Sequence, residues 1–174
     1  PRNYPFKFRN RKTLNQHYAM IGMAYVQDDY PLYYEATNEK GLSMAGLNFP
    51  DNAYYPNYDE TKDNVSPFEF IPWILSQCER VEDAEQLLAS INLYHENYSD
   101  ELPLSPLHWI IADEHCSIIV EPLKEGLKIY ENPVGVLTNN PTFDYHMMHL
   151  NDYMNLTHQV PENRFGKIEL KPYR

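Results

Sequence analysis

The distribution of apolar residues along the chain predicts strands in its first part. The run YAMIGMAYV at 18–26 is almost continuously apolar or aromatic, which is typical of a buried strand. The segment PLYYEATN at 31–38 predicts a second strand, and LSMAGLNF at 42–49 predicts a third. The turn between these two strands ends at Gly41, which can adopt positive φ, so residues 31–49 are predicted to form a β-hairpin.

The central part of the chain predicts a loop and two helices. Residues 50–64 have no apolar period and are rich in Pro, Asn, Asp and Tyr, which predicts an exposed loop. Ser66, Pro67 and Glu69 have the pattern of a capping box, with proline at the first helical position, ahead of FIPWILSQC. A second helix over 82–91 follows from apolar residues at i, i+3, i+4 and i+7, namely Ala84, Leu87, Leu88 and Ile91.

The last part of the chain predicts a meander followed by a helix. Three short apolar runs with turn residues between them predict strands at 107–113, 117–123 and 127–132, and VGVLTNNP at 134–141 predicts a fourth. Beyond it, four apolar residues repeat at helical spacing: Phe143, Met147, Leu150 and Met154. This order of elements predicts a single α+β domain over residues 1–174, with an antiparallel sheet that is covered by helices on at least one face.

Composition narrows the class of protein. A chain of 174 residues with 43% hydrophobic and 22% charged residues is long enough to bury a sizeable core. Its formal net charge of -11 argues against a nucleic-acid partner. No apolar run reaches the roughly 20 residues that span a bilayer, so no membrane association is expected. Cys78 and Cys116 are too few for a disulfide scaffold, which favours a reducing, cytoplasmic location.

Few residues in this sequence have the pattern of a catalytic centre. Both cysteines lack a neighbouring cation and base, so they are predicted to be unpaired and not catalytic. His108 lies in an apolar strand and is predicted to be a hydrogen-bonded core histidine. His146 and His149 have no third ligand at a suitable spacing, so no metal site is predicted.

Two asparagines at predicted strand ends are candidates for a catalytic role. Asn48 ends the strand before Phe49, and Asn139 ends the predicted strand at 134–141. A side-chain amide at such a position can donate a hydrogen bond to an oxyanion that forms during acyl transfer. Asparagine is also a common turn former, and the residue pattern alone does not separate the two roles.

Six stretches of the sequence together resemble the choloylglycine hydrolase family. They are DDYP at 28–31, NEKGL at 38–42, AGLNFP at 45–50, PFEFIPW at 67–73, LHW at 107–109 and GVLTNNPTF at 135–143. The segment that contains Asn48 is similar to conjugated bile salt hydrolases, whereas penicillin V acylases usually have a tyrosine at this position. The resemblance implies an N-terminal nucleophile hydrolase with an αββα sandwich, of which this chain is an internal portion.

The resemblance also implies an activity and a set of site residues. In this family, an N-terminal cysteine attacks the amide that joins a bile acid to glycine or taurine, and the cysteine's own α-amine acts as the base. Carried over to this sequence, Asn139 contributes to the oxyanion hole, and Asn48 positions the α-amine and the tetrahedral intermediate. The resemblance places five apolar or aromatic residues against the steroid: Val26, Tyr34, Tyr98, Leu102 and Leu107. It further implies a cofactor-free, bacterial, cytoplasmic homotetramer.

Two alternatives stay open, and the second follows from a departure from the family. The family's nucleophilic cysteine, and the arginine and aspartate that orient it, have no counterpart in this sequence, which opens at Pro1. The first alternative is an acylase of the penicillin V type. The second is a catalytically inactive fragment that binds amphipathic ligands, since the apolar residues are retained while the nucleophile is not.

Overall fold

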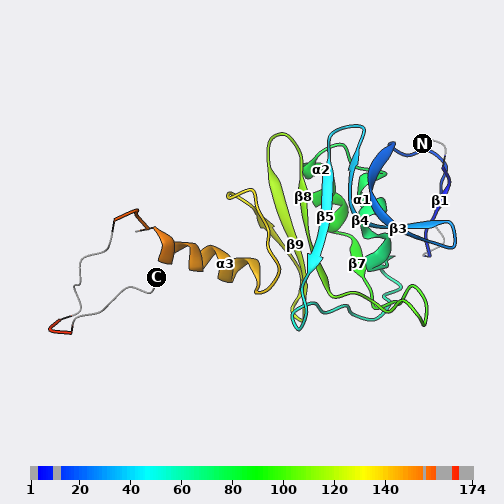
Figure 1. Cartoon of the computed structure of the whole chain (residues 1–174). Helices are drawn as coiled ribbons and strands as arrows, with labels where there is room; N and C mark the ends of the chain where they lie inside the picture. Colours follow the sequence, from blue (N-terminus) through cyan, green and yellow to red (C-terminus); the bar gives the residue numbers. More distant parts are fainter. Residues whose placement is uncertain (1–3, 10–12, 155, 160–165, 169–174) are drawn as a thin grey trace. The chain divides into compact units, whose positions relative to one another are not determined.

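The computed structural model describes residues 4–9, 13–154, 156–159 and 166–168 (Figure 1). The chain divides into two compact units, residues 1–143 and residues 144–174, which are considered separately. None of the helices in the described ranges is long and apolar enough to cross a membrane.

A six-stranded antiparallel sheet forms the centre of the first unit. Its strands, in spatial order, are β10 (Gly126–Glu131), β9 (Ser117–Leu123), β8 (Leu107–Ala112), β5 (Ser43–Asn48), β4 (Tyr30–Asn38) and β3 (Met20–Gln27). Tight turns make β3, β4 and β5 neighbours, because Asp28 and Asp29 both have positive φ between β3 and β4, and Gly41 has φ 95° before β5. The predicted hairpin and the predicted meander of three strands are both confirmed.

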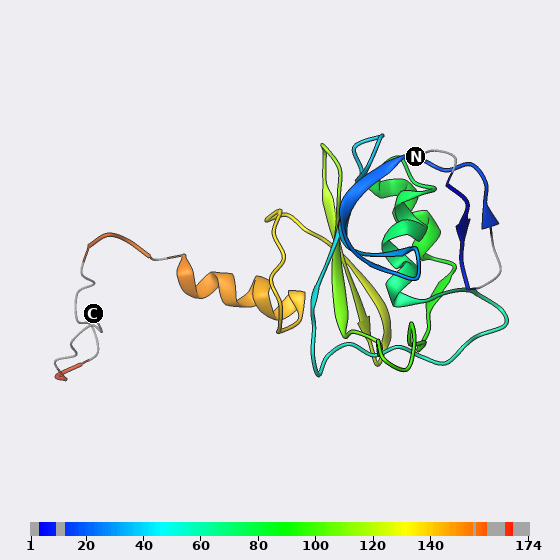
Figure 2. The same cartoon turned by 45° about the vertical axis from the view of Figure 1, so that its right-hand side comes forward.

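Two helices of the first unit cover one face of this sheet (Figures 1 and 2). The short 3-10 helix η1 (Pro67–Glu69) continues into α1 (Phe70–Leu75), all of whose residues are buried, and α2 (Val81–Leu88) follows. Trp109 of β8 lies on the covered face, with its ring edge-to-face to that of Phe70 at a centroid separation of 4.8 Å. Burial of this apolar layer against the helices is the main stabilising contribution to the fold.

Two smaller pairs of strands complete the first unit. The strands β1 (Phe6–Lys7) and β2 (Thr13–Leu14) pair antiparallel, and the adjoining Phe8 packs edge-to-face on Trp73 of α1 at 4.9 Å. The strands β6 (Asp63–Val65) and β7 (Ile91–Leu93) pair in parallel. The predicted helix over 82–91 is therefore too long, because Ile91 begins β7.

The predicted capping box at the start of the first helix is wrong. The Ser66 side chain caps no helix N–H and instead donates a hydrogen bond to the Glu96 carboxylate. Glu69 accepts a hydrogen bond from the backbone N–H of Arg9 at 2.9 Å. Both side chains are buried, so they are drawn into a tertiary polar cluster in place of the local capping pattern.

Two of the predicted strands also need correction. The strand at 18–26 is real but is not buried, because β3 is the last strand of the sheet, and Ile21 and Met23 are 80% and 65% exposed. The segment 134–141 forms no strand. Gly135 has φ 70°, and the Asn132 side chain is hydrogen-bonded to the backbone N–H of Gly135 and to the carbonyl of Val136, groups that a strand would pair with a neighbouring strand.

The helix predicted around residues 143–154 is confirmed. It consists of α3 (Phe143–His149) followed by the 3-10 helix η2 (Leu150–Tyr153). Within the second unit, the His149 ring contacts the rings of Tyr145 and Tyr153, which lie one turn away on either side, at 5.9 Å and 5.1 Å.

Candidate active site

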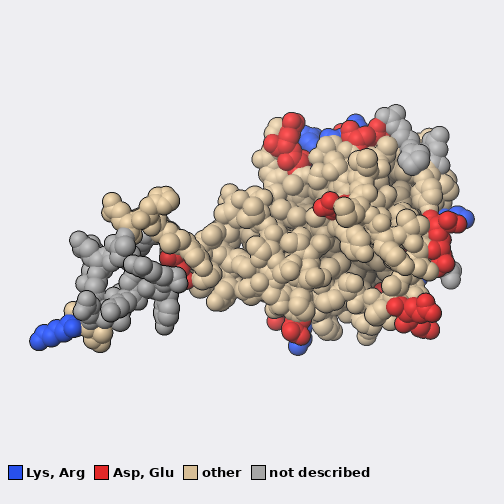
Figure 3. All heavy atoms as spheres, in the orientation of Figure 1, with Lys and Arg blue, Asp and Glu red and all other residues tan. Residues whose placement is uncertain are grey.

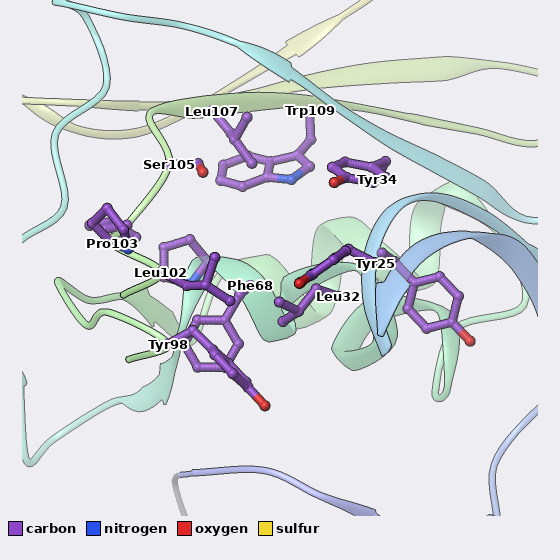
Figure 4. A pocket seen from close by; sticks show the side chains of 13 residues that line it. Tyr25, Leu32, Tyr34, Phe68, Tyr98, Leu102, Pro103, Ser105, Leu107 and Trp109 are labelled. Atoms are coloured by element: carbon purple, nitrogen blue, oxygen red, sulfur yellow. The ribbon is translucent and has the colours of Figure 1, made fainter. Parts of the chain in front are cut away.

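An apolar cavity of about 180 Å³ lies between the sheet and η1. Figure 4 shows Leu107 and Trp109 on one side of this space and Phe68, Tyr98 and Leu102 on the other. Tyr25 and Tyr34 line the cavity and are about half exposed, so its mouth is open to solvent. An open space with an apolar and aromatic lining fits the hydrophobic part of an amphipathic ligand.

Four of the five residues predicted to contact substrate meet in this cavity. They are Tyr34, Tyr98, Leu102 and Leu107, and they come from β4, the loop before β8, and β8 itself. The fifth residue, Val26, lines a different cavity of about 230 Å³ together with residues that include Tyr4 and Phe6.

The alternation of side chains along β3 explains where Val26 lies. Tyr25 is in register with Leu32 of β4, and both side chains line the first cavity. Val26 is the next residue along β3, so its side chain points to the opposite face of the sheet. Sequence reasoning missed Tyr25 and Leu32, although the strand period of two would have separated Tyr25 from Val26.

The loop over residues 94–106, which we term the pocket loop, is held by Arg9. The Arg9 guanidinium donates hydrogen bonds to the backbone carbonyls of Asn97, at 2.8 Å, and Tyr98, and it lies 3.3 Å from the Glu96 carboxylate. It also lies over the rings of Phe68 and Tyr98, at 4.8 Å and 5.3 Å from their centroids. Since both rings line the cavity, Arg9 fixes one of its walls without entering it.

A polar cluster around the buried Glu69 carboxyl lies beside the same loop. Glu69 is 2% exposed, and burial raises the pKa of its carboxyl from 4.5 to about 7. The backbone N–H of Arg9 opposes this shift, and the neighbouring Glu96 carboxylate adds to it. Tyr94 donates a hydrogen bond to Glu96, and burial and this contact raise the pKa of the phenol to about 12.

We expect Glu69 to make the fold less stable as the pH rises from about 4.5 to 7. Within this window the unfolded chain releases the Glu69 proton while the folded protein retains it, so the free energy of unfolding falls, by on the order of 1–3 kcal/mol. Urea unfolding at a series of pH values measures this slope. Glu69→Gln should flatten it, whereas Glu85→Gln, at an exposed position of α2, should leave it unchanged. An identical slope in Glu69→Gln and in the unmodified protein would contradict the assignment.

The two candidate asparagines lie on segments that the fold brings together. Asn48 is the exposed last residue of β5 and is in register with Leu107, which lines the cavity. Asn139 is exposed in the irregular segment that follows β10. Its neighbour Asn140 donates a side-chain hydrogen bond of 2.7 Å to the carbonyl of Pro50, two residues after Asn48. The structure therefore joins the two segments through Asn140.

Neither Cys78 nor Cys116 has an environment that activates its thiol. Cys78 and Cys116 are both unpaired, as predicted. Burial raises the pKa of the Cys78 thiol to about 12, and burial and then Asp113 raise the pKa of Cys116. Both thiols are thus less readily ionised than an ordinary cysteine.

The histidines and the surface charge do not indicate a metal or a polyanion. The prediction for His108 is confirmed, since it is fully buried with Nδ1 3.0 Å from Glu121 Oε1. Across the ranges described above, no group of three or more His, Cys, Asp and Glu side chains is arranged to hold a metal ion. Figure 3 shows Asp and Glu side chains, with a few Lys and Arg beside them, mainly at the margins of one face of the first unit, and the surface between them is largely uncharged.

The comparisons with known proteins agree on one family. Residues 1–174 match the family model of linear amide C–N hydrolases, choloylglycine hydrolase family. The family model groups the chain with linear amide C–N hydrolases. The chain belongs to the choloylglycine hydrolase family.

Two curated relatives illustrate this relationship. The chain is 52% identical over 174 residues to a bile salt hydrolase/transferase of Lactiplantibacillus plantarum, covering 99% of this chain and 54% of that protein. It is 42% identical over 174 residues to a bile salt hydrolase/transferase of Clostridium perfringens, covering 98% of this chain and 53% of that protein. The chain thus spans about half the length of these curated relatives.

The structural comparisons confirm the predicted fold class. A single-residue variant of conjugated bile acid hydrolase from Clostridium perfringens matches with a TM-score of 0.85 and 41% identity, covering 99% of this chain and 54% of that one. Penicillin V acylase from Agrobacterium tumefaciens matches with a TM-score of 0.71 at 21% identity, covering 90% and 48%, which shows a shared fold alone. Both are N-terminal nucleophile hydrolases, so the mixed α and β unit described above is a partial form of that fold.

Proposed function

We propose that this chain is part of a conjugated bile salt hydrolase, which cleaves the amide bond between a bile acid and glycine or taurine. The observation that carries the proposal is the convergence of Tyr34, Tyr98, Leu102 and Leu107 in one open apolar cavity, in a chain of this family. The names of the relatives from Lactiplantibacillus plantarum and Clostridium perfringens support the same substrate class. We use the term complete hydrolase for a polypeptide that joins this chain to the remaining half of the relatives' length.

In the proposed reaction, the nucleophile is an N-terminal cysteine supplied by the rest of the complete hydrolase. Its α-amine takes the thiol proton as the sulfur attacks the amide carbon, and the carbonyl oxygen becomes an oxyanion. Asn139 donates a hydrogen bond to this oxyanion, and Asn48 orients the α-amine. The C–N bond then breaks, the leaving amine takes up a proton, and water hydrolyses the thioester to release the bile acid.

The cavity suits the steroid part of such a substrate. Its walls are formed by aromatic and aliphatic side chains from β3, β4, β8, η1 and the pocket loop, which can bury part of the ring system while the rest lies at the open mouth. The end of β5 with Asn48 is in register with Leu107 of the cavity wall, so the polar, amide-bearing end of the substrate would lie toward the asparagines. The Val26 cavity is a separate space. Val26 would therefore contact only a part of the substrate that extends beyond the first cavity.

One assay tests the substrate class. The purified complete hydrolase is incubated with glycocholate, taurocholate and penicillin V, and the released glycine, taurine and 6-aminopenicillanic acid are quantified. We expect release from the bile salts to be at least about tenfold faster than from penicillin V. The opposite ranking would favour the acylase alternative. Binding of glycocholate without any hydrolysis would favour the alternative of an inactive, amphipath-binding protein.

The assembly and location of the protein are further parts of the proposal. We propose a cofactor-free homotetramer in a bacterium on the basis of the family resemblance. The cytoplasmic location rests on the same resemblance and on the low cysteine content, and the single domain over residues 1–174 rests on the predicted order of elements. Light scattering on the purified complete hydrolase measures its mass in solution, and a monomeric mass would contradict the tetramer.

Arg9→Ala should weaken substrate binding more than it slows turnover. Loss of the guanidinium removes the hydrogen bonds to the Asn97 and Tyr98 carbonyls and frees the pocket loop. We expect KM for glycocholate to rise about tenfold, equivalent to about 1.4 kcal/mol, with kcat within twofold. Arg9→Lys should not restore KM, because an ammonium group cannot reproduce the planar fork.

The control for this prediction is Lys7→Ala on β1. Lys7 is exposed, lies two residues before Arg9, and lines neither of the two cavities. Steady-state kinetics of the three variants should show a raised KM only when Arg9 is changed. Equal KM values in Arg9→Ala and Lys7→Ala would mean that the pocket loop does not depend on Arg9.

A further inference from the structure

A buried polar pair, His108 and Glu121, lies on the face of the sheet opposite to α1 and α2. Trp109 and Val120 are in register on the helix-covered face, so the preceding His108 and the following Glu121 point to the other side. Both side chains are fully buried, and His108 Nδ1 lies 3.0 Å from Glu121 Oε1. The pair is distant in sequence from both candidate asparagines.

Each member of the pair contacts one of the two asparagine-bearing segments. The His108 ring stacks on Phe49, with centroids 4.2 Å apart and an interplanar angle of 9°, and Phe49 directly follows Asn48. Glu121 Oε1 accepts a hydrogen bond of 3.0 Å from the backbone N–H of Phe143, four residues after Asn139. The pair therefore links the segment after β5 with the segment that leads into α3.

Stability alone does not explain this pair. Within the described residues, His108 Nε2 and Glu121 Oε2 are buried and have no hydrogen-bond partner, and leaving such groups unpaired costs folding free energy. An apolar pair of similar volume would avoid this cost. What an apolar pair would not provide is a directional contact with the Phe143 N–H, which fixes the backbone at one point.

We propose that His108 and Glu121 are a positioning pair that holds the segments of Asn48 and Asn139 in a fixed relation to each other. His108 acts through the ring of Phe49, and Glu121 acts through the backbone of Phe143. The hydrogen bond from Asn140 to the Pro50 carbonyl joins the same two segments on their exposed side. The consequence for catalysis rests on the proposed function, whereas the positioning itself does not.

Glu121→Leu tests the pair by removing both contacts of the carboxylate. We expect the Phe143 amide to exchange its hydrogen with solvent at least about tenfold faster, because it loses its acceptor. With glycocholate as the probe, kcat per titrated active site should fall about tenfold, and KM should stay within twofold because no cavity residue is changed. Glu121→Gln keeps an oxygen acceptor of similar size and should restore both values to within about threefold of the unmodified protein.

A matched control separates positioning from a general loss of stability. Ile111→Ala alters another fully buried residue of β8, but one whose side chain faces the helices. It should lower the unfolding midpoint while kcat per active site and exchange at Phe143 stay unchanged. If Glu121→Leu does not fold, His108→Phe keeps the stack on Phe49, removes the Nδ1 contact, and should still lower kcat by about threefold or more.

The results distinguish this inference from the proposed function. If the unmodified complete hydrolase does not cleave bile salts, the proposed function fails, and the exchange of the Phe143 amide still decides whether Glu121 fixes that segment. If Glu121→Leu folds with Phe143 exchange unchanged, or with kcat per active site within twofold, the positioning pair is refuted even though the hydrolase is active.

Discussion

Asn139→Ala in the complete hydrolase should lower kcat by a factor of about 10²–10³, the effect of removing one donor from an oxyanion hole. The side-chain amide is expected to donate to an oxygen that carries full negative charge only in the tetrahedral intermediate. KM for glycocholate should change less than threefold, because the ground-state carbonyl gains little from the same hydrogen bond. Circular dichroism shows whether the variant is folded. Active-site titration gives the concentration of active enzyme, so that kcat of the variant and of the unmodified protein can be compared per active site.

The neighbouring asparagine provides the sharpest comparison. Asn140 donates its side-chain hydrogen bond to the Pro50 carbonyl, so Asn140→Ala should loosen the link between the two segments and reduce kcat by less than about tenfold. A larger loss in Asn140→Ala than in Asn139→Ala would transfer the oxyanion role to Asn140. Unchanged kcat in a folded Asn139→Ala would remove Asn139 from the catalytic groups.

Much of the sheet could be predicted because its signals are local. The turn at Gly41 requires a residue that tolerates positive φ, and the apolar runs on both sides of it are long enough for strands. The three strands of the meander are short apolar runs between turn residues, and the structure places all three side by side. Patterns of this kind depend on a few neighbouring residues, so tertiary contacts seldom override them.

The wrong predictions concern features that distant contacts decide. Ser66 has a good local sequence for capping a helix, but its hydroxyl donates a hydrogen bond to the partly buried Glu96 carboxylate, thirty residues later. The run at 134–141 is apolar enough for a strand, yet the Asn132 side chain binds the backbone groups that a strand would need. The apolar character of β3 predicts burial, but the strand lies at the edge of the sheet, where Ile21 and Met23 are exposed.

The residues of the candidate site also could be predicted only in part. Tyr34 is far in the sequence from Tyr98, Leu102 and Leu107, and no periodicity links them, so only the family resemblance predicts that all four contact the substrate. The contribution of Arg9 could not be read from the sequence, because the basic segment around it has the pattern of a solvated edge. The His108–Glu121 pair could be predicted only in part, because a histidine in an apolar strand predicts a hydrogen-bonded core residue but does not identify its partner.

Trp109→Ala should produce the largest loss of stability among substitutions in the cavity wall. The indole is fully buried, packs edge-to-face on Phe70, and lies 6.5 Å from the ring of Tyr55. Truncation of such a side chain removes its transfer free energy and leaves a void, with an expected cost of about 3–5 kcal/mol in the free energy of unfolding. Trp109→Phe retains an aromatic ring in the same position and should cost less than half as much.

Urea unfolding of the complete hydrolase measures these differences, with Tyr54→Ala as the control. Tyr54 is an aromatic residue of the same unit but is 44% exposed, so its truncation should cost less than about 1 kcal/mol. Because Trp109 also lines the cavity, Trp109→Ala should raise KM for glycocholate at temperatures where the variant is still folded. A loss of stability no larger than that of Tyr54→Ala would mean that the sheet and α1 do not depend on the indole that lies between them.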